Sequence, residues 1–110
     1  WIMQKGDVWL VNIPELGSRE QAGMRPAIIL ANPKTPLVVV IPCTSNLYAL
    51  RFPFTLLLEP SNQNGLDEPS VALIFHIRAI DRRLLQKKLG VIARKKLTDS
   101  ERLTRKLFDL

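Results

Sequence analysis

Two strongly apolar segments joined by a short turn constrain the fold of this chain more than any other feature. Residues 27–30 and 37–41 are almost entirely aliphatic, with many β-branched side chains, as is typical of β-strands. The residues between them, Asn-Pro-Lys-Thr-Pro at 32–36, favour a turn. Because neither segment alternates apolar with polar positions, we expect both faces of this hairpin to be covered by other parts of the protein.

The rest of the chain supplies further short strands and one helix. Thr98 and Glu101 form a capping-box pattern, and leucines at 103, 107 and 110 follow at helical spacing, which predicts a C-terminal helix that starts at Thr98. Five or six strands with one helix predict a mainly-β fold, a small and strongly twisted barrel, as a single domain over residues 1–110. The predicted additional strands are 8–13, 51–58 and 70–75; residues 77–81 favour a helical turn, and 84–92 fit a strand or a helix.

The hairpin also predicts which polar residues lie together. A loop at 32–35 would place Ala31 opposite Pro36 and Arg25 opposite Pro42, with Thr44 just beyond. Opposed and diagonal residues in such a ladder lie within roughly 5–8 Å of each other. We therefore expect Arg25 to lie near Thr44 and Ser45, at the open end of the hairpin.

The net charge of +6 is concentrated in the last third of the chain. Residues 76–110 carry eleven basic and four acidic side chains, whereas residues 1–75 carry five basic and six acidic ones. This asymmetry fits a polyanionic or acidic partner, and a basic surface that serves solubility is the equal alternative. The single cysteine and the lack of a signal-peptide pattern or long apolar run favour a cytoplasmic protein.

Arg25 and Thr44 are the strongest candidates for chemistry. A guanidinium group offers a planar, permanently charged fork of donors that matches a phosphate, and a neighbouring hydroxyl can bond a second phosphate oxygen. In RNA cleavage the adjacent 2′-hydroxyl is the nucleophile, so the protein needs only to position the phosphate, stabilise charge and move protons. An edge arginine and a turn threonine without a catalytic role is the alternative.

Glu20 and His76 are the candidate proton carriers, since histidine titrates unaided near neutral pH. A packed strand-end histidine and a solvent-facing loop glutamate are the alternatives. Cys43 follows an apolar run and is expected to be a small buried side chain, not a nucleophile. No carboxylate cluster, histidine pair or glycine-rich phosphate loop stands in the sequence, so we expect neither a metal nor another cofactor.

Several other side chains are candidates for contacting RNA. Tyr48 and Arg51 lie in a polar segment shortly after Thr44, where an aromatic ring and a cation can bind unpaired bases and phosphates. Trp9 and Phe54 are expected in the core. The remaining candidates for substrate binding are Gln21, Ser45, His76 and Arg78.

Several blocks of this sequence resemble the MazF/PemK/Kid toxins of bacterial toxin–antitoxin systems. Gly-Ser-Arg-Glu-Gln-Ala-Gly-Met-Arg-Pro at 17–26 is similar to the family's Gly-Ser-Glu-Gln-x-Gly-x-Arg-Pro block, and Val-Ile-Pro-Cys-Thr-Ser at 40–45 to its strand that ends in Pro-x-Thr-Ser. Further similar segments are 5–9, 70–71, 77–84 and 88–90.

The resemblance implies an SH3-like barrel with a C-terminal helix, working as a homodimer. It implies a metal-independent, sequence-specific endoribonuclease that acts on single-stranded mRNA by 2′-hydroxyl attack and is neutralised by an antitoxin. Arg25 would be the principal catalytic residue, as proton donor and stabiliser of the transition state, with Thr44 as its partner and Glu20 in a block linked to activity. A toxin on the same scaffold that inhibits a protein such as DNA gyrase is the first alternative, and a catalytically inactive RNA- or peptide-binding barrel is the second.

The sequence departs from the family pattern at two places. Arg19 separates Ser18 from Glu20, and Phe75-His76 stands where many members carry an acidic residue and a glutamine. The second difference favours His76 as a base contact or proton carrier.

Overall fold

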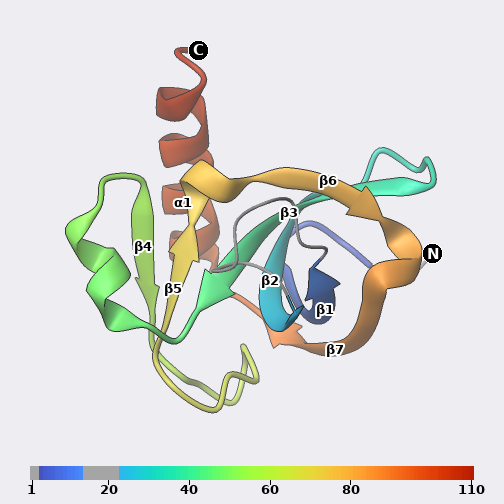
Figure 1. The fold of residues 1–110 in the computed structure, drawn as a ribbon, viewed down its shortest axis with the longest axis horizontal. Coiled ribbons are helices and arrows are strands. Elements are labelled where there is room, and N and C mark those ends of the chain that lie inside the picture. The colour runs from blue at the N-terminus through green and yellow to red at the C-terminus, as the bar shows by residue number, and fades with distance from the viewer. Residues whose placement is uncertain (1–2, 14–22) are drawn as a thin grey trace.

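A computed structural model describes residues 3–13 and 23–110, which form seven strands, one α-helix and three short 3-10 helices (Figure 1). The strands are β1 (Asp7–Ile13), β2 (Gly23–Ala31), β3 (Leu37–Thr44), β4 (Thr55–Leu58), β5 (Ser70–Leu73), β6 (Arg78–Asp81) and β7 (Leu85–Val91). The helices are η2 (Leu47–Arg51), η3 (Ile74–His76), η4 (Arg82–Leu84) and α1 (Arg94–Leu107).

Strand β3 is the centre of the sheet. The order is β4-β5-β3-β2-β1-β7, every pair is antiparallel, and β6 also pairs with β3. One edge of β3 pairs with β2. The other edge pairs with β6 over Leu37–Val40 and with β5 over Cys43 and Thr44. Pro42, which has no N–H to donate, lies where β3 changes partner. The sheet consequently bends around β3 into a barrel-like shape (Figure 1).

Two apolar cores lie on opposite faces of the central strands. Val8, Ile28 and Ile41 belong to one core, which α1 covers with Leu97, Leu103 and Leu107. Their neighbours on the same strands, Val11, Ile29 and Val40, belong to the other core, because successive side chains of a strand point to opposite faces. The prediction that both faces of the hairpin are covered is therefore confirmed, as is the mainly-β, barrel-like fold with a C-terminal helix.

The predicted register of the hairpin is wrong by two residues. Ala27, not Arg25, pairs with Pro42, and Ala31 pairs with Val39 across a bulge. Next to the turn the difference is three residues, because Ala31 pairs with Val39 instead of Pro36, and the extra residue of the bulge at Leu30 reduces it to two. If the register is continued from Ala27, Arg25 lies opposite Thr44 itself.

Three other element predictions also need correction. The predicted helical turn at 77–81 is wrong, because these residues include β6, which pairs with Leu37–Val40 of β3 and buries Ile80. The predicted strand at 51–58 is shortened to Thr55–Leu58, and the strand at 70–75 ends at Leu73 where η3 begins. The segment 84–92, open between strand and helix, contains β7.

The helix begins one turn earlier than the capping pattern predicts. Its first residue is Arg94, and its N-cap, Ala93, makes no side-chain capping bond. Thr98 is therefore inside the helix, and Glu101 forms an ion pair with Lys5 instead of a capping bond. The basic residues at 94–96 are good helix formers, which explains why the helix extends past the predicted start.

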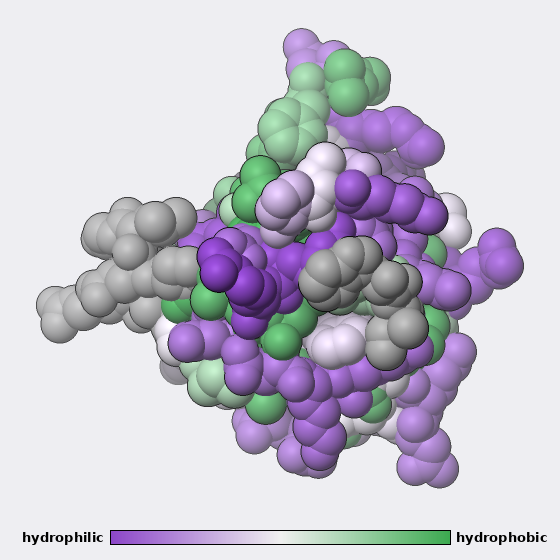
Figure 2. All heavy atoms as spheres, turned by 90° about the vertical axis from the view of Figure 1, so that its right-hand side faces the viewer, coloured by the Kyte–Doolittle hydropathy of each residue, from purple (hydrophilic) through white to green (hydrophobic). Residues whose placement is uncertain are grey.

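Hydrophilic side chains cover much of the face at the right of Figure 1, which Figure 2 turns toward the viewer. None of the helices in the described ranges has the length and apolar character needed to cross a membrane.

Candidate functional site

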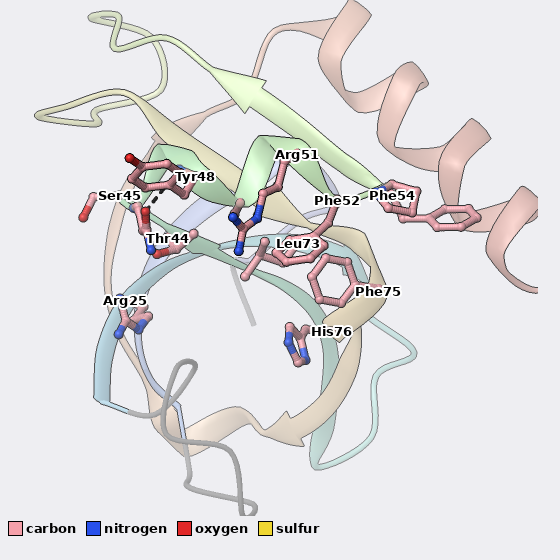
Figure 3. Close-up of a pocket in the computed structure, with 13 residues that line it drawn as sticks. Arg25, Thr44, Ser45, Tyr48, Arg51, Phe52, Phe54, Leu73, Phe75 and His76 are labelled. Carbon is pink, nitrogen blue, oxygen red and sulfur yellow. Dashed lines mark hydrogen bonds between the residues drawn. The ribbon is translucent and has the colours of Figure 1, made fainter.

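A groove of about 770 Å³ lies at the end of β3 and brings together residues from five elements. Arg25 comes from β2, Thr44 from β3, and Tyr48 from η2, while Leu73 and His76 come from β5 and η3. Figure 3 shows Arg25, Arg51 and His76 bordering the open region from different sides. The groove therefore combines fixed cations with aromatic surface.

Arg25 has an unusual hydrogen-bonding state. It pairs at the backbone with Val11 of β1, and its side chain is only partly exposed. Among the described residues, Nε of Arg25 is the one buried side-chain polar atom without a hydrogen-bond partner. An unpaired donor of this kind costs about 1–3 kcal/mol, and a bound anion that accepts the bond would recover that cost. Arg25 is thus suited to hold a ligand oxygen.

Local sequence sets the orientation of Thr44. Its Oγ1 accepts the backbone N–H of Asn46 at 3.2 Å, and Asn46 Oδ1 accepts the N–H of Tyr48 at 3.1 Å. These are the short side-chain turns that threonine and asparagine favour, and they start η2 directly after β3. In the described part of the chain no acceptor for the Thr44 hydroxyl proton is found, so this proton can bond a ligand.

Aromatic rings and one cation form much of the groove wall beyond Thr44. The guanidinium of Arg51 lies 4.9 Å from the ring centre of Phe52 and 5.9 Å from that of Tyr48. The rings of Phe52 and Phe75 pack edge to face with their centres 6.5 Å apart, and the ring centres of Phe75 and His76 are 4.6 Å apart. Tyr48 remains 75% exposed. Such a wall offers π-faces on which planar groups can stack.

Comparison with known proteins identifies the family. A model described as the PemK-like, MazF-like toxin of type II toxin–antitoxin systems matches residues 4–108. The chain belongs to this family. It is 31% identical over 102 residues to Endoribonuclease MazF of Staphylococcus saprophyticus, covering 89% of this chain and 84% of that protein.

Solved structures agree with this family and with the fold. The crystal structure of MazF from Deinococcus radiodurans superimposes with a TM-score of 0.82 at 26% identity, covering 100% of this chain and 99% of that chain. A MazE-MazF structure from the same organism gives a TM-score of 0.77 at 26% identity, covering 100% and 98%. The resemblance to MazF/PemK toxins and the expectation of a type II toxin are confirmed.

The groove collects most of the residues that the sequence predicted for this PemK/MazF-like site. Arg78 is in β6 opposite Val40 and does not line the groove, so its contact with RNA stays a prediction. Glu20 and Gln21 lie outside the described residues. Those that line the groove are Arg25, Thr44, Ser45, Tyr48, Arg51 and His76.

Asn46 and Phe75 are groove residues that the sequence did not single out. The Thr-Ser-Asn order is a recognisable turn signal, so Asn46 was within reach of sequence reasoning. Phe75 was assigned to a strand end, and no local signal places it against Phe52. Trp9 is buried as expected, and Phe54 packs against the core while it also lines the groove.

Other reactive side chains lie apart from this chemistry. In the described ranges, no group of three or more histidine, cysteine, aspartate or glutamate side chains gathers where it could hold a metal ion. Asp81 bonds Arg83, and these bonds lower the pKa of its carboxyl to about 2; both groups are at the surface. Because solvent and salt screen this surface ion pair, it contributes little to the stability of the fold.

Cys43 is fully buried, which confirms the expectation of a small buried side chain. Burial raises the pKa of Cys43 from 9.0 to about 12, and only the thiolate is nucleophilic. Because each pKa unit lowers the thiolate fraction tenfold, we expect iodoacetamide to alkylate the folded protein at pH 8 about 10³-fold more slowly than the urea-unfolded protein. Mass spectrometry measures both rates.

A Leu110→Cys variant is the control, since position 110 is 91% exposed, and it should gain one rapidly added label. Rapid labelling of Cys43 in the native state would contradict the burial.

Proposed function

We propose that this toxin is an endoribonuclease that cleaves single-stranded mRNA, with Arg25 and Thr44 at the scissile phosphate. The observation that carries the proposal is the buried, unpartnered Nε of Arg25 in the same groove as the Thr44 hydroxyl. A guanidinium can donate to two phosphate oxygens, and the hydroxyl of Thr44 can donate to another phosphate oxygen. The relatives named as endoribonucleases support the reaction class.

The reaction that fits this groove needs no nucleophile from the protein. The 2′-hydroxyl oxygen attacks the adjacent phosphorus, the bond from phosphorus to the 5′-oxygen breaks, and the products carry a cyclic phosphate and a 5′-hydroxyl. Arg25 stabilises the negative charge that builds on the phosphate oxygens. One proton must leave the 2′-hydroxyl and another must reach the 5′-oxygen. His76 lines the groove and is a proposed proton carrier or base contact. Glu20 is a second proposed proton carrier, on the basis of the sequence alone.

The aromatic wall is the proposed surface for unpaired bases. Tyr48 is the most exposed ring in it, and base–aromatic stacking contributes about 1–3 kcal/mol per base. Arg51 adds a positive charge that can pair with a phosphate or stack on a base. A base-paired strand cannot offer these faces, which supports single-stranded RNA as the substrate.

The same groove is the proposed target of an acidic antitoxin. Arg25 and Arg51 line it, and an anionic peptide segment would compete with RNA for these cations. The similar MazE-MazF structure supports a protein partner of this kind. We further propose a homodimer and a cytoplasmic location, where mRNA is found; exposed apolar side chains such as Leu37 and Phe108 fit a subunit interface.

The test is incubation of purified protein with a long single-stranded RNA in EDTA. We expect discrete fragments with 5′-hydroxyl ends, because the proposed chemistry uses no metal. Intact RNA, while circular dichroism shows a folded protein, would exclude the proposed activity. Inhibition of DNA gyrase under those conditions would favour the non-enzymatic toxin on this fold, and binding of RNA without cleavage would favour the inactive barrel.

A further inference from the structure

A second, smaller cavity lies on the other side of Arg25. It has a volume of about 380 Å³ and is formed between β1, β2, β7 and the connection from β4 to β5. Arg25 and Ser45 line both this cavity and the groove. A phosphate at Arg25 would therefore have one neighbouring nucleotide beside the groove and the other beside the cavity.

The cavity wall is held in place by close backbone packing. The connection between β4 and β5 lies against β7, and Val91 N donates to Gln63 O at 2.8 Å. A Cβ atom on Gly90 would lie 2.2 Å from that same oxygen, so the two segments approach as closely as glycine allows. The Asn64 side chain accepts the N–H groups of Ser61 and Leu66 and donates to Glu59 O. The cavity is thus preformed and does not depend on a ligand for its shape.

The lining matches the edge and faces of a nucleobase. Leu10, Leu66 and Leu89 provide apolar surface against which a flat ring can pack. Asp67 and Glu68 are exposed carboxylates of the lining, and in the described ranges neither forms an ion pair. Arg25 and Lys87 also line the cavity and balance the charge of these carboxylates, so the carboxylates are best suited to accept hydrogen bonds from the amino group of a base.

We propose that this cavity binds the base of one nucleotide that flanks the cleaved bond, and that Asp67 and Glu68 select adenine or cytosine over uracil. This inference rests on the proposed ribonuclease function and adds a specificity site to it. Adenine and cytosine carry an amino group, N6 or N4, at the position where uracil carries the O4 carbonyl and guanine the O6 carbonyl. Carboxylates placed to accept from N6 or N4 would face O4 of uracil, lose that hydrogen bond and repel the oxygen.

The test measures cleavage preference with RNAs randomised around the cut site, whose 5′-hydroxyl ends are sequenced. Asp67→Asn and Glu68→Gln are compared with Glu59→Gln, a control that removes an exposed carboxylate of the same connection outside the cavity. We expect wild-type protein to disfavour uridine at one position next to the cut. At least one of the two variants should lower that discrimination about tenfold, because an amide can donate to a uracil oxygen. Preferences at all other positions, and those of Glu59→Gln, should not change.

A second measurement isolates the amino group. Replacing the preferred nucleoside with its analogue that lacks only the amino group, zebularine for cytidine or nebularine for adenosine, should slow wild-type cleavage about tenfold. The same replacement should have little effect on the variant that lost discrimination. A carboxylate that acts only through charge would instead change cleavage of every sequence by the same factor when neutralised, and this result would overturn the subsite.

The outcomes separate this inference from the proposed function. If wild-type protein cleaves RNA but tolerates uridine on both sides of the cut, or if both variants keep the wild-type preference, the specificity site is wrong and the ribonuclease stands. If wild-type protein cleaves no RNA, the proposed function fails and the inference fails with it.

Discussion

Replacing Arg25 with alanine is expected to lower the rate of RNA cleavage by about 10³-fold, because the variant loses the donor fork that stabilises charge on the reacting phosphate. The fold should tolerate the change, since the Arg25 side chain makes no hydrogen bond through Nε and lies at the lip of a groove. Single-turnover cleavage of a defined RNA measures the rate, and thermal unfolding measures the stability. We expect the melting temperature to equal or exceed that of the wild type, because an unpaired buried donor is removed.

Arg25→Lys is the matched variant for this prediction. Lysine keeps the positive charge but presents a point donor instead of a planar fork. If geometry matters, the lysine variant should stay at least about 10-fold slower than wild type even at saturating RNA. Full activity in Arg25→Ala would show that the phosphate is held elsewhere, and the assignment of the groove would be wrong.

Replacing Gly65 with alanine is expected to destabilise the fold by about 3 kcal/mol, of which overpacking contributes about 1–3 kcal/mol and the left-handed backbone about 1–2 kcal/mol. Gly65 has a φ of +70°, and a Cβ atom there would lie 2.0 Å from the carbonyl oxygen of Leu89. That oxygen belongs to the backbone of β7 and cannot turn aside as a side chain would. Thermal unfolding should show a drop of more than about 10 °C in melting temperature.

Gly23→Ala separates backbone strain from steric clash. Gly23 has a φ of +95°, but none of the residues that the structure describes lies within 4 Å of a Cβ atom built there. This variant should lose only about 1 kcal/mol, part of which the reduced entropy of the unfolded chain offsets. Equal losses in both variants would mean that the connection between β4 and β5 yields without cost, and the cavity would then not be preformed.

The sequence predicted the parts of the molecule that depend on local chemistry. Continuous apolar runs at 27–30 and 37–41 required cover on both faces, and the structure provides two cores. The turn at 32–36 joined the strands that carry Arg25 and Thr44, so their proximity survived an error of two residues in register. Leucine spacing predicted the C-terminal helix because one apolar face of a helix repeats every three to four residues.

The parts that depend on distant partners could not be predicted in the same way. Ile77 to Asp81 have no decisive local preference, and β6 forms because the first half of β3 has an open edge to pair. The wall of the groove brings Phe52 against Phe75, and no spacing rule links two residues so far apart in the chain. The N-cap of the helix, Ala93, makes no side-chain capping bond. The nearest capping pattern in the sequence, at Thr98, therefore predicts a start one turn after the true one.

The short hydrogen-bonded run from Thr44 through Asn46 to Tyr48 separates two tasks along the chain. Thr44 is fixed at the end of a buried strand, whereas the ring of Tyr48 projects from a 3-10 turn that buries none of its own residues. In the proposed complex with RNA, substitutions in this turn would alter which bases are bound while the Thr44 hydroxyl stays in place. Because this turn buries none of its own residues, the proposed function predicts that exchanging residues 47–53 changes cleavage preference with little loss of stability.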